Sequence, residues 1–209
     1  SMDVHTLVIT STVPEESKSN VAVNLALTLA ESGKKVALVD CDLRKPVLHR
    51  YLKAGHNVKG VSNVLSNQCT LDEALQELKE MNLTFLPAGT PPPNPSEMLS
   101  QPQMQAMVDA LREKFDFVIF DAPPVSVVTD AAVIGRYVDG AMFVVRSDYA
   151  PADAVRGAVK KLQDAGVRVL GSVLTRYDMK KALKGSSYAY SYAYNYNYAY
   201  EKQKADVAE

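Results

Sequence analysis

The chain has 209 residues, 47% of them hydrophobic, and a formal net charge of −1, which suits one globular domain with a short extension. With so balanced a charge we expect no nucleic-acid partner and no general attraction to an anionic membrane surface. No apolar run reaches the ~20 residues that span a bilayer. The two cysteines, Cys41 and Cys69, lack metal-ligand spacing, and we expect them to be reduced thiols.

Apolar runs rich in β-branched residues alternate with helical patterns along the chain. Strands are predicted over His5–Thr10, Lys35–Asp40, Leu83–Pro87, Phe115–Asp121, Ala141–Arg146 and Val167–Thr175. A helix over Ser19–Ser32 is predicted to end at Gly33, a common C-terminal stop. Thr70 and Glu73 form a T-x-x-E capping box, which predicts a helix through about Lys79. Further helices are predicted over Ser96–Lys114 (broken near Pro102), Asp130–Tyr137 and Ala152–Ala165.

This alternation indicates a doubly wound α/β fold. Continuous apolar strands separated by helices predict a mostly parallel sheet with helices on both faces. Ligands of such folds bind at the carboxyl ends of the strands. Past Arg176 the pattern ends, and tyrosine occupies every even position from 188 to 200, with only Ala, Ser and Asn between. We therefore predict one domain over residues 3–178 and a flexible low-complexity tail over residues 179–209.

The segment between the first strand and the first helix has the position of a phosphate-binding loop. It reads TVPEESKS, against the pattern G-x-x-x-x-G-K-[ST], with Thr12 and Ser17 at the two glycine positions. In such a loop Lys18 reaches the β- and γ-phosphates and the Ser19 hydroxyl binds Mg²⁺. The alternative is a surface turn that contains Lys-Ser by chance. The candidate cofactor-binding residues are Val13, Pro14, Glu15, Glu16, Ser17, Lys18, Ser19 and Asn20.

The side chains of this loop also carry features that disfavour a phosphate site. Glycine serves there because it tolerates a positive φ and lets the backbone approach the ligand. A serine at position 17 costs roughly 1–2 kcal/mol if its backbone is left-handed, and little otherwise. Glu15 and Glu16 would stand beside a polyanion.

Two further stretches place carboxylates at strand ends. VALVDCDLRKP delivers Asp40 and Asp42, and FDFVIFDAPP delivers Asp121, in the manner of a Walker B strand whose aspartate orders Mg²⁺. Each could instead be a strand-ending turn, because aspartate caps turns and Pro123-Pro124 suits one. Since all three stretches occur in the order of a nucleotide site, we predict that the chain binds a Mg²⁺–nucleotide.

Together these stretches resemble the bacterial tyrosine kinases (BY-kinases), the P-loop kinases of polysaccharide co-polymerase systems. The resemblance runs from TSTVPEESKSNVAVNLALTLAESGKKVALVDCDLRKPVLH through LPAGTPPPNPSEML, FDFVIFDAPPVSVVTDA and VLGSVLT to the tyrosine tail. DCDLRKP is similar to the family's second Walker motif, A′. The family usually has glycine at the position of Ser17, often glycine at Glu15, and often asparagine at Thr175.

The resemblance implies ATP/ADP and Mg²⁺ as cofactors and a role for each carboxylate. Lys18 would hold phosphates and stabilise the transferring group. Ser19 would ligate Mg²⁺, with Asp40 and Asp121 holding the ion through water. Asp42 would be the base that accepts the attacking tyrosine's proton, in a reaction that depends mainly on positioning and charge stabilisation.

The resemblance also implies that the tail is the substrate of autophosphorylation. The phosphoacceptors would be Tyr188, Tyr190, Tyr192, Tyr194, Tyr196, Tyr198 and Tyr200. The alternative for seven tyrosines with a period of two is a strand with all rings on one face, or an adhesive linker. The implied partners are neighbouring copies in a ring, an inner-membrane polysaccharide co-polymerase segment or activator chain, and a tyrosine phosphatase. The implied location is the cytoplasmic face of the bacterial inner membrane.

Two other classes of protein remain open. A MinD- or ParA-like ATPase would carry a lysine early in the loop, where this chain has Val13, and would not need the tyrosine tail. A non-catalytic nucleotide-binding scaffold, its tail phosphorylated by another kinase, would tolerate the changed loop. It would have no need to retain Lys18, Ser19 and the three aspartates.

Overall fold

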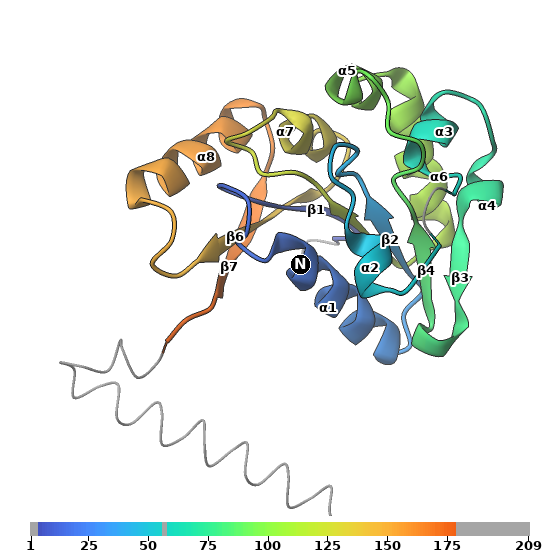
Figure 1. Ribbon diagram of the computed structural model, residues 1–209, viewed down its shortest axis with the longest axis horizontal. Helices are drawn as coiled ribbons and strands as arrows, with labels where there is room; N and C mark the ends of the chain where they lie inside the picture. The colour runs from blue at the N-terminus through green and yellow to red at the C-terminus, as the bar shows by residue number, and fades with distance from the viewer. Residues whose placement is uncertain (1–3, 56–57, 179–209) are drawn as a thin grey trace, which may run out of the picture. The chain divides into compact units, whose positions relative to one another are not determined.

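The computed structural model describes residues 4–55 and 58–178 of the chain. The chain divides into two units, Ser1–Thr175 and Arg176–Glu209, and every element named below belongs to the first (Figure 1). The predicted phosphoacceptor tyrosines, positions 188–200, lie outside the described residues. Among the described residues, no helix has both the length and the apolar character needed to cross a bilayer.

A seven-stranded sheet forms the centre of the first unit, in the order β3-β4-β2-β5-β1-β6-β7. Neighbouring strands are parallel except β3 and β4, which pair antiparallel at one edge. The prediction of a mostly parallel α/β sheet is confirmed. The strands are β1 (Thr6–Ser11), β2 (Val36–Asp40), β3 (Gln76–Leu78), β4 (Leu83–Leu86), β5 (Phe117–Asp121), β6 (Gly140–Arg146) and β7 (Val169–Thr175).

Helices cover both faces of this sheet, as Figure 1 shows. The helices are α1 (Lys18–Glu31), α2 (Leu48–Tyr51), α3 (Val61–Leu65), α4 (Leu71–Ala74), α5 (Pro95–Leu99), α6 (Pro102–Lys114), α7 (Asp130–Gly135) and α8 (Ala152–Asp164), with a 3₁₀ turn at Lys79–Met81. Side chains of α1 and α2 share one core cluster with one face of the strands, and those of α3 and α5–α8 share a second cluster with the other face.

The strands belong to both clusters because successive side chains point to opposite faces. In β1, Leu7 and Ile9 pack in the α1 cluster and Val8 packs in the other. In β5, Ile119 packs in the α1 cluster and Val118 packs in the other. The central strands are therefore apolar on both faces, which is why their sequences read as continuous hydrophobic runs.

The helix predicted to run through about Lys79 is wrong. The capping box does form, since the Glu73 N–H donates to Thr70 Oγ1 and the Thr70 N–H donates to Glu73 Oε2. However, α4 ends at Ala74, Leu75 is extended, and Gln76–Leu78 becomes β3, paired with β4. The backbone partners in β4 outweigh the local helical signal, because capping stabilises only the first turn.

Two short helices, α2 and α3, have no counterpart in the predicted elements, because four or five residues are too few to show a 3.6-residue period. The predicted break near Pro102 is confirmed, since α5 ends at Leu99 and α6 begins at Pro102. Proline takes the first position of α6, where its missing N–H costs nothing.

Candidate nucleotide-binding site

The three candidate segments meet because their strands are neighbours in the sheet. Strand β5 lies between β2 and β1. Asp121 of β5 pairs in register with Asp40 of β2 on one side and with Ile9 of β1 on the other. The carboxyl ends of these parallel strands thus lie at one edge of the sheet. The β1–α1 loop, Asp40, Asp42 and Asp121 are brought together there.

Lys18 is the residue on which these groups converge. Its Nζ lies 3.2 Å from Asp121 Oδ1, 3.5 Å from Asp42 Oδ2, and donates to Ser19 Oγ at 3.2 Å. Burial works to lower the pKa of Lys18, but the charges of Asp121, Asp42 and Asp40 outweigh burial, and the pKa is raised. Lys18 is therefore a cation held at the first turn of α1.

Asp40 and Asp121 lie beneath the loop, almost completely buried. Burial, followed by the charge of Asp121, raises the pKa of Asp40 to about 7, although a hydrogen bond from the Leu48 N–H opposes the rise. Burial also raises the pKa of Asp121, against the lowering effects of Lys18 and Ser19. Asp121 Oδ2 is buried and accepts no hydrogen bond from the residues that the structure describes.

The loop after β2 holds Asp42 at the rim of the site. Asp40 Oδ1 accepts from the Asp42 N–H at 3.2 Å, and Asp42 Oδ1 accepts from the Lys45 N–H at 2.9 Å. The second oxygen of Asp42 faces Lys18, and the side chain is 10% exposed. Of the three aspartates, Asp42 is thus the one that an incoming group can reach.

The backbone of the β1–α1 loop is left-handed at two non-glycine residues, Glu15 (φ 65°) and Ser17 (φ 70°). Ser17 is the residue just before α1, and its side chain makes no cap to the helix. The backbone of Ser17 is therefore left-handed, and this conformation costs roughly 1–2 kcal/mol relative to glycine. The loop thus has a positive φ at two positions where glycine would adopt it more easily.

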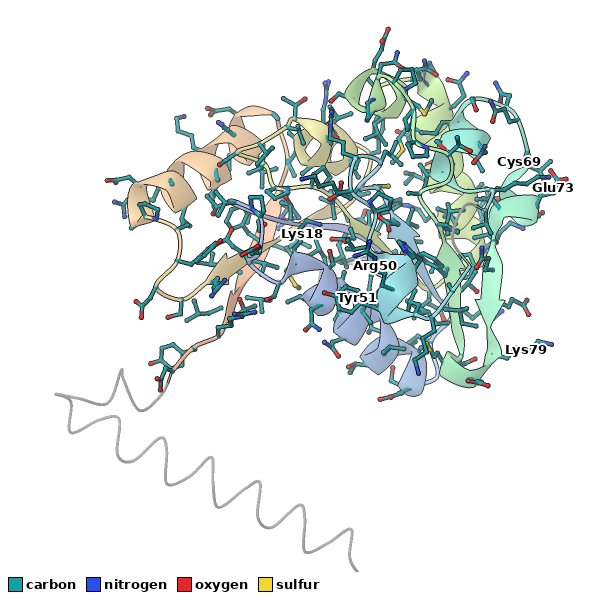
Figure 2. All side chains as sticks on the ribbon, in the orientation of Figure 1. Lys18, Arg50, Tyr51, Cys69, Glu73 and Lys79 are labelled. Atoms are coloured by element: carbon teal, nitrogen blue, oxygen red, sulfur yellow. The ribbon has the colours of Figure 1, made fainter. Side chains whose placement is uncertain are left out.

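A pocket of about 410 Å³ opens above this loop. Lys18 and Tyr51, both labelled in Figure 2, line the same pocket from α1 and α2. The residues that line it are Pro14, Glu15, Ser17, Lys18, Ser19, Asp42, Arg44, Lys45, Val47, Tyr51, Pro123, Pro124, Val127 and Val128. Cationic and hydroxyl groups stand at the loop, and apolar groups form much of the wall.

Not every candidate of the loop faces this pocket. Val13 and Asn20 are absent from its lining, and Glu16 turns inward and is fully buried. Thr175 Oγ1 donates to the Glu16 carbonyl at 3.0 Å, so the hydroxyl at this position is used to hold the loop. The sequence prediction assigned no role to Arg44, Lys45 and Tyr51, although Arg44 and Lys45 follow Asp42 directly in DCDLRKP.

The donor set fits a metal only when a nucleotide brings further ligands. Among residues 4–55 and 58–178, no three His, Cys, Asp or Glu side chains are placed to hold a metal ion by themselves. The unpartnered Asp121 Oδ2 and the nearby Ser19 hydroxyl are oxygen donors, which Mg²⁺ prefers. Mg²⁺ is typically bound by one or two carboxylates together with phosphates and water, and the residues present agree with that arrangement.

Fold and site together define a P-loop nucleotide-binding protein: a Lys-Ser pair opens α1 after β1, and aspartates end β2 and β5. Residues 16–138 match the family model described as AAA domain. An AAA domain is a P-loop ATPase domain, which implies that the chain binds ATP.

Sequence and structure comparisons identify closer relatives. The chain is 36% identical to the tyrosine-protein kinase YwqD of Bacillus subtilis over 87% of this chain and 75% of that one. The solved kinase domain of VpsO superposes with a TM-score of 0.80 at 32% identity, covering 84% of this chain and 86% of that one. The chimerical protein CapA2B2 gives the same TM-score at 35% identity, covering 84% and 77%. The chain belongs to the bacterial tyrosine kinase family and is a protein-tyrosine kinase homologue.

Proposed function

We propose that this chain is an ATP-dependent tyrosine autokinase that phosphorylates its own C-terminal tyrosine cluster, Tyr188 to Tyr200. The observation that carries the proposal is the placement of Lys18 Nζ against Asp121 and Asp42 in a pocket whose rim carboxylate is accessible. Membership of a tyrosine kinase family supports the chemistry, and the tyrosine tail supplies an acceptor on the same chain.

In this proposal Lys18 binds the β- and γ-phosphates and stabilises the charge of the transferring group. Ser19, Asp40 and Asp121 hold Mg²⁺, directly or through water. When bound, Mg²⁺ neutralises charge on the phosphate oxygens. Asp42 accepts the proton of the attacking phenol, whose pKa near 10 makes it easier to deprotonate than an aliphatic hydroxyl.

The proposal assigns the kinase domain to residues 3–178 and the substrate tail to residues 179–209. Tyr188 lies twelve positions after Arg176, a span of up to roughly 40 Å when extended. That length permits transfer within one chain or to a neighbour, and the family favours a neighbour in a ring. A tyrosine phosphatase would restore the unmodified tail.

A membrane partner completes the proposal. The similar solved protein CapA2B2 is a chimera, which supports pairing of the kinase with a co-polymerase segment or activator chain. We infer a location on the cytoplasmic face of the bacterial inner membrane and a role in extracellular or capsular polysaccharide synthesis and export.

The test is incubation of phosphatase-treated protein with ATP and Mg²⁺, followed by intact-mass and peptide mass spectrometry. We expect a ladder of phosphoryl additions confined to residues 188–200. Lys18→Met removes the phosphate-binding cation and should abolish the ladder. Lys160→Met, at a side chain that is 72% exposed on α8, is the matched control and should leave the ladder unchanged.

A ladder that persists in Lys18→Met would contradict the proposed site. The absence of a ladder in the unmodified sequence, with Mg²⁺–ADP still bound, would favour the need for an activator segment. The absence of both would favour the non-catalytic scaffold, for which the left-handed Glu15 and Ser17 are the supporting observation.

A further inference from the structure

Glu16 has an unusual environment for an acidic residue in a phosphate-binding loop. It is fully buried, and it is the one glutamate among the described residues in that condition. Its Oε2 accepts from the Val13 N–H at 2.8 Å, and its Oε1 accepts from the Arg146 N–H at 3.2 Å. One carboxylate therefore joins the start of the loop to the end of β6.

A second set of contacts holds the same segment from outside. The Glu16 carbonyl accepts from Thr175 at the end of β7. The Arg146 guanidinium donates to the Glu15 carbonyl at 3.3 Å and lies 4.2 Å from the centre of the Tyr149 ring. Glu15 and Glu16 are thus fastened to the two strands that follow β1 in the sheet (Figure 1).

These contacts surround the two strained residues. Glu15 and Ser17, on either side of Glu16, both have a positive φ. Residues other than glycine rarely adopt that backbone conformation, and it persists only where the surroundings impose it. The carboxylate of Glu16 has its two acceptor oxygens matched to two backbone donors, and these hydrogen bonds constrain the segment between the two strained residues.

We propose that Glu16 is a positioning residue that keeps the β1–α1 loop in its phosphate-binding conformation in place of the missing glycines. The proposal rests on the nucleotide site of the proposed function. Glu16 is buried and does not line the pocket, so it acts through the loop backbone and not by contact with a nucleotide. Its two carboxylate oxygens are occupied by backbone N–H donors within the fold, which also explains how an acidic residue is tolerated in this loop.

The test compares the effect of Glu16→Gln in the native loop with its effect in a loop whose strained residues are replaced by glycine. Glu16→Gln replaces one acceptor oxygen by an amide that faces a backbone N–H, so one hydrogen bond is lost. The same change is then made in the Glu15→Gly/Ser17→Gly background, where the loop conformation is no longer strained. Glu113→Gln, at an exposed glutamate of α6, is the matched control.

The readout is the dissociation constant for Mg²⁺–ADP from titration calorimetry. In the native loop, Glu16→Gln should weaken binding about tenfold or more, the effect of losing a hydrogen bond to a charged group. In the glycine background the same change should cost no more than about threefold, because glycine adopts the positive φ without support. Equal losses in both backgrounds would show that Glu16 only stabilises the fold, and no loss in either would overturn the proposal.

A second variant and a second readout cover two cases: a Glu16→Gln protein that does not fold, and an unmodified chain that binds no nucleotide. If Glu16→Gln does not fold, Thr175→Val removes the tie to the Glu16 carbonyl without changing a charge, and its loss of affinity should likewise shrink in the glycine background. Hydrogen exchange of residues 12–19 in nucleotide-free protein should be faster in either variant than in the unmodified chain. If the unmodified chain binds no Mg²⁺–ADP, the proposed function fails, but hydrogen exchange still shows whether Glu16 holds the loop. Unchanged exchange in the variants would contradict the role proposed for Glu16.

Discussion

Asp40 illustrates how burial sets the chemistry of a single side chain. The residue is 1% exposed, and burial, together with the charge of Asp121, raises the pKa of its carboxyl from 3.8 to about 7. The unfolded chain releases this proton near pH 4, whereas the folded chain keeps it until about pH 7. Ionising Asp40 in the folded state therefore costs free energy, and its contribution to stability falls as the pH rises between these two values.

Replacing Asp40 by asparagine removes this titration. We expect the free energy of unfolding of Asp40→Asn, relative to the unmodified protein, to rise by about 3 kcal/mol from about pH 5 to about pH 8. Urea denaturation of nucleotide-free protein at several pH values measures the difference. Asp109→Asn, at an exposed aspartate of α6, is the control, and a pH-independent difference for Asp40→Asn would show that Asp40 does not titrate as described.

The two cysteines differ in the same physical terms. Burial raises the pKa of the Cys41 thiol well above its usual value, and Cys41 is fully buried. Burial also raises the pKa of Cys69, but this side chain is partly exposed and Lys59 opposes the rise. Because the thiolate is the reactive form, iodoacetamide should modify Cys69 first and reach Cys41 only after denaturation. Peptide mass spectrometry reads the outcome, and equal rates in native protein would contradict it.

The elements around the site are connected by an ion pair that is buried on its carboxylate side only. Arg44, in the loop after β2, has its Nε 3.1 Å from Asp130 Oδ2 at the start of α7. Ser96 of α5 donates to Asp130 and accepts from Arg44 at 2.8 Å. Asp130 is fully buried, whereas the Arg44 side chain is 38% exposed. The loop that carries Asp42 is therefore linked to α5 and α7, which pack on the face of the sheet opposite α1.

Breaking this pair from its two sides should have unequal effects. Arg44→Ala leaves a buried carboxylate without its cation and should lower the free energy of unfolding by about 3 kcal/mol. Asp130→Asn removes the buried charge and leaves an arginine that water can reach, so we expect a loss of about 1 kcal/mol. The double variant should lose less than the sum of the two.

Urea denaturation of the four proteins of this cycle measures the coupling between Arg44 and Asp130. Losses that simply add would mean that the two side chains do not depend on each other. A loss for Asp130→Asn larger than that for Arg44→Ala would contradict the assignment of the penalty to the buried carboxylate.

For the molecule as a whole, charge is the property that the proposed reaction changes most. The chain carries a net charge of −1, and seven phosphotyrosines would add about −10 to −14. Packed copies with such tails would repel one another, over a distance of about 10 Å at 0.1 M salt and less at higher salt. Phosphorylation should therefore loosen an oligomer, and a phosphatase should restore it.

Sedimentation velocity of phosphatase-treated and fully phosphorylated protein tests this expectation. The phosphorylated form should sediment as a smaller species at about 0.1 M salt, and the difference should shrink at about 1 M. A chain that ends at Asp178 lacks the tyrosine cluster and should sediment alike after both treatments. An oligomer that is unchanged at full phosphorylation would rule the idea out.

The alternation of strands and helices, the mostly parallel sheet and the positions of Lys18, Asp40, Asp42 and Asp121 were predictable from the sequence alone. These features depend on local signals: continuous apolar runs, helical periods, and polar residues that end a strand. Because parallel strands share one carboxyl edge, the order of the motifs along the chain was enough to predict that they meet.

Only the tertiary structure decided the features that depend on partners far away in the chain. Gln76–Leu78 became a strand because β4 offers its backbone groups, against a local helical signal. Arg44 found Asp130 86 residues further on, and Glu16 turned inward to the N–H of Arg146, 130 residues away. The positive φ of Glu15 and Ser17 occurs where Glu15 and Glu16 contact strands far away in the chain, whereas the local sequence alone disfavours it.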